Sequence, residues 1–254
     1  MGFARTGTEP RTTSSESGPW TGLEPVGWLG ELQPRTLALL LDGARLLDVP
    51  PGGTVVRRGE RVGALHVVVS GSLELSTTTA SGRRHVSAYL EPGQVIGLIP
   101  LLDERGAIHD AVAHEATRLL RVSAEGFRAA LHADPTLQAR MLTLLAARSR
   151  GLYASVTAST VQPLRMRLAR LLISLRAAHG AEPGTDGATI GLRVSQESLA
   201  EMLGVRRQRL NATLKAMERA GIVRMGYSRI VVLDEAALRA CTADVPDPDG
   251  DRPD

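Results

Sequence analysis

Apolar residues recur at two different spacings along the chain, and the change of spacing divides it. From about residue 20 to 122, glycines separate short apolar runs that alternate in the manner of strands, as at Leu65, Val67 and Val69. The apolar residues that follow keep a helical spacing instead. Short strands between turn residues are typical of a barrel or jelly roll, and residues 29–47 are predicted to form a helix that leads into it. The pattern therefore predicts an α+β chain with a β-rich part first.

A long helix is predicted to begin at Asp134–Pro135, an N-cap followed by proline at the first helical position. It extends to about Ser159. Its apolar residues lie on one broad side: Leu137, Met141, Leu144, Leu145, Leu152 and Val156. Such a side favours dimerisation against a second copy, and burial against the chain's own strands is the alternative. After a break at Pro163, an amphipathic helix at 164–178 and a loop at 180–191 are expected.

Residues 194–232 carry the pattern of two short helices around Gly204, followed by a hairpin. Ser195 is the predicted N-cap of the first helix, and Leu199, Ala200 and Leu203 form its apolar face. In the second helix the apolar residues at i, i+4 and i+7 are Leu210, Leu214 and Met217. Its outward-facing residues are then Arg206, Arg207, Gln208, Asn211 and Lys215. Arg, Gln and Asn match base edges in the major groove, so the pattern predicts a winged helix-turn-helix.

The distribution of charge supports a contact with a phosphate backbone. The formal net charge of the chain is only +3. Between Arg193 and Arg229, however, eight arginines and lysines face three glutamates, so the rest of the chain is slightly acidic. A basic patch on a near-neutral protein suits double-stranded DNA. A small helical domain with a solvated basic face is the alternative.

Several function classes find no support in the sequence. Cys241 is the only cysteine, which excludes a disulfide within the chain and any cysteine-ligated zinc or iron–sulfur site. His109 and His114 are five apart on a predicted strand and face opposite sides, so they do not suggest a haem pocket. No phosphate loop, metal-ligand cluster or nucleophile elbow points to an enzyme, and no metal or other cofactor is expected. The chain shows no signal peptide and no membrane-spanning run, so a cytoplasmic protein without a membrane partner is expected.

A β-roll, a long helix and a winged helix-turn-helix together resemble the CRP/FNR family of bacterial transcription regulators. The resemblance covers nearly everything from Leu29 to Leu238. Its most specific pieces are SQESLAEMLGVRR, LKAMERAGIV and RIVVL, with VIGLIPLLDERGAIHDAVAHEATRLLRV in the β-roll. It implies a homodimer that binds a palindromic operator under the control of an effector held in the β-roll. RNA polymerase would be a further partner if the protein is an activator.

The resemblance divides the chain into five segments. Residues 1–19 and the acidic residues 244–254 are expected to be disordered. Residues 20–133 form the sensor domain, which is similar to a cyclic-nucleotide-binding β-roll. Residues 134–162 form the dimerisation helix and hinge, and residues 163–243 form the DNA-binding domain.

The effector site departs from the pattern of the nucleotide-binding members, whose motif reads close to GELGLL…RSAT. Gly97 matches, but Leu98 replaces the glutamate that holds the ribose. Ala107 and Ile108 replace the arginine and hydroxyl residue that hold the cyclic phosphate, and Leu152 and Tyr153 replace the hydroxyl pair near adenine. A buried phosphate needs a cation and donors. We therefore expect the cyclic-AMP site to be lost. The chain would then respond to another small ligand, be active without one, or be cyclic-AMP-responsive through an atypical pocket.

The resemblance also assigns roles at the DNA. Arg207 matches the family arginine that reads a guanine, Gln208 stands where many members have glutamate, and Asn211 is a further base-reading candidate one turn later. Ala212 replaces a second base-reading arginine, so the operator should differ. The candidate phosphate contacts are Ser195, Arg206, Arg209, Lys215, Arg224 and Arg229. The competing hypothesis is a ligand-sensing or scaffolding protein whose helix-turn-helix binds protein.

Overall fold

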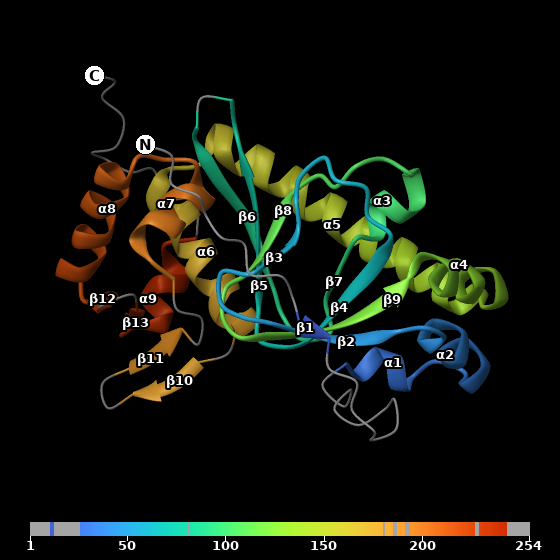
Figure 1. Ribbon diagram of the computed structural model, residues 1–254. Helices are drawn as coiled ribbons and strands as arrows, with labels where there is room; N and C mark the ends of the chain where they lie inside the picture. Colours follow the sequence, from blue (N-terminus) through green and yellow to red (C-terminus); the bar gives the residue numbers. More distant parts are fainter. Residues whose placement is uncertain are drawn as a thin grey trace. The chain divides into compact units, whose positions relative to one another are not determined.

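The computed structural model describes residues 11–12, 26–80, 82–179, 181–184, 187–190, 194–226 and 229–242. Contacts divide the chain into two compact units, residues 1–146 and 147–254. The division falls inside the long helix α5 (Pro135–Val161), so each unit contains part of that helix. Figure 1 shows the elements of both units.

The first unit is built on two antiparallel sheets. One sheet has the spatial order β1 (Arg11–Thr12), β2 (Arg45–Val49), β9 (Thr117–Ser123), β4 (Ala64–Ser70) and β7 (Val95–Ile96). The other has the order β3 (Thr54–Val56), β8 (Asp110–Ala113), β5 (Leu73–Thr78) and β6 (Arg84–Leu90). Val68 and Leu119 of the first sheet pack against Leu73 and Leu90 of the second. The sheets therefore face each other across an apolar interior, which confirms the predicted β-roll.

Strand β4 is buried on both faces rather than on one. Leu65, Val67 and Val69 point away from the second sheet, into a cluster with the helices, whereas Val68 points toward that sheet. The sequence alternation found the first face correctly. The second face is apolar as well because β4 is a central strand between two layers of core.

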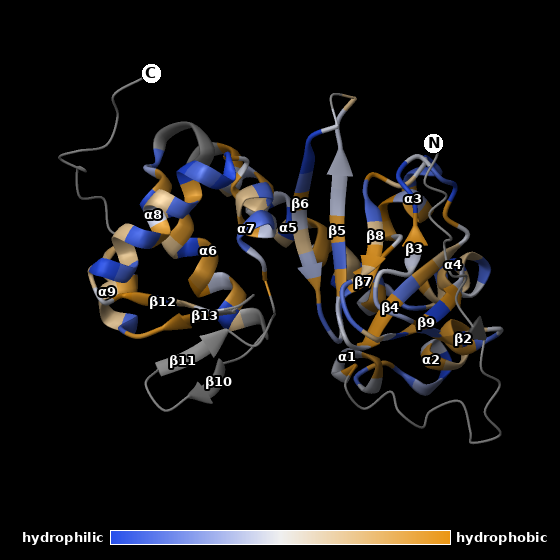
Figure 2. Ribbon diagram, turned by 60° about the vertical axis from the view of Figure 1, so that its left-hand side comes forward, coloured by the Kyte–Doolittle hydropathy of each residue, from blue (hydrophilic) through white to orange (hydrophobic). Residues whose placement is uncertain are grey.

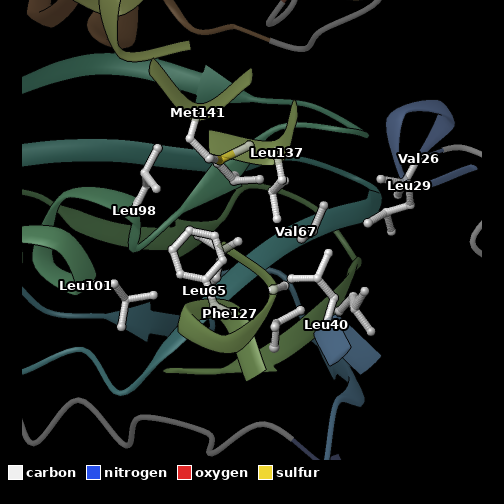
Figure 3. Packing of buried hydrophobic residues seen from close by; sticks show 14 of the residues in the cluster. Val26, Leu29, Leu40, Leu65, Val67, Leu98, Leu101, Phe127, Leu137 and Met141 are labelled. Atoms are coloured by element: carbon white, nitrogen blue, oxygen red, sulfur yellow. The ribbon is translucent and has the colours of Figure 1, made fainter. Parts of the chain in front are cut away.

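Helices cover the outer face of the first sheet. They are α1 (Gly27–Gly30), α2 (Pro34–Leu41), α3 (Leu98–Asp103), α4 (Ala124–Ala133) and the first turns of α5. Figure 3 shows Phe127 at the centre of this cluster, with Leu65, Leu98 and Met141 around it. The beginning of α5 is thus part of the core of the β-roll.

Asp134 fixes the start of α5, as predicted. One of its carboxylate oxygens accepts hydrogen bonds from the backbone N–H groups of Thr136 and Leu137, at 2.8 and 3.3 Å. The other accepts a 2.8 Å bond from the hydroxyl of Thr36 in α2. These bonds hold the pKa of Asp134 below its ordinary value, with the Thr36 bond contributing most. One carboxylate therefore caps α5 and ties it to α2.

Two expectations for the N-terminal part are corrected. The helix predicted at 29–47 breaks into α1 and α2, which ends at Leu41, and residues 45–49 form strand β2. Within the segment predicted to be disordered, residues 11 and 12 pair with Asp48 and Leu47 of β2. The remaining residues of 1–19, and the tail 244–254, lie outside the described residues.

The second unit contains the end of α5, four further helices and one sheet. Its helices are α6 (Leu164–His179), α7 (Gln196–Leu203), α8 (Arg207–Arg219) and α9 (Glu235–Ala240). Its antiparallel sheet has the order β10 (Ala181–Gly184), β11 (Gly187–Ile190), β13 (Arg229–Val232) and β12 (Val223–Gly226). The predicted loop at 180–191 is therefore wrong for residues 181–184 and 187–190, which pair as a hairpin, and β11 also pairs with β13.

An ion-pair network joins α6 to α9 within this unit. Glu235 accepts from Arg176 of α6 and from Arg239, and these two arginines hold its pKa at about 2. Over the described part of the chain, no helix combines the length and apolar character that crossing a membrane requires.

Candidate nucleic-acid interface

Helix α7 is the first helix of the motif, and its ends are set by the residues that the sequence indicated. The hydroxyl of Ser195 accepts a 3.0 Å hydrogen bond from the backbone N–H of Ser198, which caps the N-terminus. At the other end Gly204 has φ +66°, a left-handed conformation that glycine adopts without strain. The chain can therefore turn sharply into α8, and Leu199, Ala200 and Leu203 are buried as predicted.

Helix α8, the recognition helix, has one buried and one exposed face. Leu210, Leu214 and Met217 are fully buried at the predicted spacing. Arg206, Arg207, Gln208 and Arg209 are all exposed at its beginning, and Lys215 is exposed further along. Figure 2 shows hydrophilic and hydrophobic residues alternating along this helix. Forked donors are thus gathered at the end of the helix that enters a major groove in helix-turn-helix proteins.

Arg207 lies within reach of an acid on the preceding helix. Its Nη1 is 3.7 Å from Oε2 of Glu197, and both side chains are largely exposed. An exposed pair at this distance contributes little to stability. It does bias the direction of the guanidinium, while leaving it open to a base.

Asn211 is placed differently from its prediction. Its side chain is half-buried, and its Oδ1 is buried without a hydrogen-bond partner. A bidentate contact with adenine needs both the oxygen and the amide nitrogen at the base edge. In this conformation Asn211 therefore does not present the complete pair of groups outward.

The wing is joined to the recognition helix by polar contacts that sequence reasoning missed. Oε1 of Glu218 accepts a 2.9 Å hydrogen bond from the backbone N–H of Met225 in β12. Nε2 of Gln196 contacts the Sδ of Met225 at 3.6 Å. Arg224 is exposed on β12, and Arg229 begins β13. The hairpin predicted from the sequence is therefore fixed to both helices of the motif, although the side chain of Arg229 lies outside the described residues.

The candidate effector residues do not come together as one site. Leu98 is fully buried in the cluster under the helices, next to Leu101 in Figure 3. Ala107 is buried elsewhere, with Val56 and Ala111, whereas 48% of Ile108 is exposed. Tyr153 on α5 is 74% exposed.

Gly97 is the one position of this motif that keeps the family residue, and its geometry explains why. Its φ is +96°, and a Cβ at this position would lie 2.6 Å from the carbonyl oxygen of Ala64. A side chain would therefore clash with strand β4. Gly97 sets the turn that leads into α3, whichever ligand the β-roll takes.

Comparisons with protein families match both units separately. A Crp-like helix-turn-helix domain matches residues 166–241, and a cyclic nucleotide-binding domain matches residues 46–134. The chain belongs to the CRP/FNR family of transcription regulators. Its helix-turn-helix is thus the DNA-binding domain of a CRP/FNR regulator.

Relatives among characterised CRP/FNR proteins align over most of the chain. It is 28% identical to the cyclic AMP receptor protein of Thermus thermophilus, over 82% of this chain and 92% of that protein. It is 26% identical to the HTH-type transcriptional regulator Cmr of Mycobacterium tuberculosis, over 80% of this chain and 79% of that protein. These relatives are transcription regulators.

Solved CRP/FNR structures share the fold. A CRP/FNR-family regulator of Thermus thermophilus superimposes with a TM-score of 0.67 at 21% identity, covering 78% of this chain and 97% of that one. FixK2 of Bradyrhizobium japonicum gives a TM-score of 0.68 at 19% identity, covering 80% and 98%. The β-roll and winged helix-turn-helix predicted from the sequence are confirmed.

Proposed function

We propose that the protein acts as a homodimer that recognises a palindromic operator by inserting α8 into the major groove of each half-site. The observation that carries this proposal is the exposure of Arg207, Gln208 and Arg209 on the first turn of α8, opposite the buried Leu210 and Leu214. Side chains at this place are free to reach base edges and phosphates, while the buried face holds the helix on its domain.

The residues of α8 divide into two roles. Arg207 reads a guanine through its fork, and Gln208 reads an adjacent base, with adenine preferred. Asn211 joins them only if its side chain rotates so that Oδ1 leaves its buried position. We therefore assign base reading to Arg207 and Gln208 first.

The phosphate contacts position the domain without reading sequence. Arg206 and Arg209 flank the start of α8, and Lys215 lies two turns later on an exposed face. Arg224 and Arg229 belong to the two strands of the wing. Ser195 contributes through the N-terminus of α7, since its hydroxyl already accepts the capping hydrogen bond.

A homodimer is supported by an exposed seam on α5. Leu142, Leu145, Ser149, Leu152 and Val156 follow each other at spacings of three and four residues, which is the heptad pattern of a coiled coil. Leu142 and Leu152 are each 67% exposed. The adjacent stripe of Leu137 and Met141 is buried against the β-roll. The helix thus serves both predicted purposes, on two neighbouring stripes.

The relatives named for cyclic AMP favour an effector of that kind, but the residues here favour a different behaviour. Leu98 belongs to the hydrophobic core and Ile108 is exposed, so neither offers a polar group to a nucleotide. Desolvation of a phosphate without a cation and donors costs several kcal/mol or more. We therefore propose operator binding without cyclic AMP, with any effector being an uncharged small molecule. At promoters that it activates, RNA polymerase would be the partner.

The experiment is a selection of duplexes from a random library by purified, nucleotide-free protein, with a parallel arm that contains cyclic AMP. We expect the same palindrome in both arms, with half-sites about one helical turn apart. Enrichment only with cyclic AMP would keep the regulator and reject our interpretation of the β-roll. If neither arm enriched a motif, and random DNA bound without steep salt dependence, the helix-turn-helix would be a protein-binding module instead.

A further inference from the structure

Arg167 lies on the first turn of α6, where the three helices of the DNA-binding domain meet. Its backbone N–H donates to the carbonyl of Pro163 at 3.1 Å, so the residue belongs to the beginning of the helix. The side chain leaves α6, and its Nη2 donates a hydrogen bond to the backbone carbonyl of Leu203. This carbonyl is the last of α7, directly before the Gly204 turn. One guanidinium therefore joins α6 to the corner between α7 and α8.

The chemistry of this contact is favourable. The last carbonyls of a helix have no partner within the helix and carry the negative end of its dipole. A guanidinium supplies both a donor and a positive charge, and a hydrogen bond to a charged group is stronger than a neutral one. Arg167 is half-buried, which keeps water from replacing it at this carbonyl.

A second cation lies near this contact. Arg209, on the first turn of α8, is close enough to Arg167 for its charge to lower the pKa of that guanidinium, after the larger effect of burial. Like charges are not brought together for stability alone. The geometry is that of a buried arginine which holds the corner while an exposed one faces outward.

We propose that Arg167 is a positioning residue for the recognition helix, which fixes the α7–α8 corner to α6 and so sets sequence discrimination without contacting DNA. This proposal rests on the DNA-binding function proposed above. Side chains that read bases must be held to within about 0.5 Å and 10–20°. Arg207 and Gln208 follow the corner within four residues of Leu203, so a loosened corner misplaces them first.

The chain offers a matched control on the same helix. Arg170 lies almost one turn later, is exposed, and donates from Nη2 to the backbone carbonyl of Thr242 at 3.2 Å, beyond the end of α9. It has the same residue type and the same kind of acceptor as Arg167, but its acceptor lies outside the helix-turn-helix. Arg209→Gln provides the reference for loss of a phosphate contact.

The test uses the full chain, the palindromic duplex selected by the wild type, and a scrambled duplex of equal length, each measured over a range of salt concentrations. For Arg167→Met we expect affinity for the palindrome to fall about tenfold, affinity for the scrambled duplex to stay unchanged, and the salt slope to stay at the wild-type value. Arg170→Met should bind like the wild type. Arg209→Gln should weaken both duplexes and reduce the slope by about 0.9.

Two results would overturn the proposal. Unchanged discrimination in Arg167→Met would remove the positioning role, and equal weakening of both duplexes with a reduced slope would make Arg167 a phosphate contact. If Arg167→Met does not melt cooperatively, Arg167→Lys, which keeps the stem and the charge, is measured against the same criteria. Failure of the wild type to bind either duplex would reject the DNA-binding function itself and is thereby distinguished from failure of this inference.

Discussion

His66 is a buried, uncharged histidine on the central strand of the first sheet. It lies in register with Arg121 of β9 and Ile96 of β7, and only 7% of it is exposed. Burial, with a smaller contribution from Arg121, lowers its pKa to about 4. The ordinary pKa is near 6.5, so the unfolded chain takes up this proton first as the pH falls. Folding therefore opposes protonation of His66 between these two values.

We predict that the free energy of unfolding falls as the pH is lowered from about 6.5 to about 4, by up to about 3 kcal/mol from this residue. His66→Phe has no proton to take up and should show a flatter profile over that range. Urea unfolding at a series of pH values measures both curves. Parallel curves for the two proteins would show that His66 titrates alike in the folded and unfolded chain.

Leu98 and Ile108 stand at two positions of the same family motif but in opposite surroundings. Leu98→Ala removes methyl and methylene groups from a fully buried side chain and should lower the free energy of unfolding by about 2–5 kcal/mol. Ile108→Ala, at a position that is 48% exposed, should change it by about 0.5 kcal/mol or less. Chemical denaturation of both variants tests the difference. Similar small losses would mean that Leu98 does not belong to the core.

Arg207 carries the most specific prediction at the DNA. Arg207→Ala should reduce discrimination at one base pair in each half-site by about 1–3 kcal/mol and leave preference at the other positions. Repeating the duplex selection with the variant shows which position becomes degenerate. A uniform loss for all sequences, with a salt slope reduced by about 0.9, would instead make Arg207 a phosphate contact.

At the scale of elements, the sequence predicted best where local chemistry marks a boundary. Ser195, Gly204 and Asp134 act on backbone groups a few residues away, and the structure places each at the predicted helix end. The apolar run at 37–47 has no such mark, and its second half becomes strand β2 because β9 supplies a partner far along the chain. The same holds for 187–190, whose pairing with β13 no local pattern reveals.

The candidate sites follow the same rule. The outward direction of Arg207 and Gln208 follows from the buried spacing of Leu210 and Leu214 on one helix. The buried oxygen of Asn211 depends on the packing around α8, which the helical period alone does not give. The contact of Arg167 with Leu203 joins residues 36 positions apart, so only the fold brings it into view.

Helix α5 carries its own prediction, because the exposed seam should be covered by a second copy. Leu152→Asp places a charge in the seam and should convert the protein to a monomer. Ala147→Asp introduces the same residue at an exposed position on the other side of the helix, at a similar cost in helix propensity, and should remain a dimer. Sedimentation or light scattering over a range of concentrations measures the difference. A dimeric Leu152→Asp protein would place the subunit contact elsewhere.

At the scale of the whole molecule, dimerisation and DNA reading have to act together. Each unit alone carries only part of the task, since the seam lies on α5 and the base-reading side chains lie on α8. Two recognition helices in one dimer make the second half-site contact intramolecular, so affinity rises without any new contact. The gain exists only if both half-sites face the protein at once.

Half-site spacing therefore tests the assembly directly. Inserting about five base pairs between the half-sites turns them to opposite faces of the duplex, because one helical turn is about 10–10.5 base pairs. For the wild type we expect affinity to drop to that of a single half-site. Leu152→Asp should bind the original and the expanded operator equally, since a monomer contacts one half-site at a time. Equal binding of both operators by the wild type, as measured by titration at constant salt, would contradict a rigid two-helix reading of the palindrome and leave each DNA-binding domain acting alone.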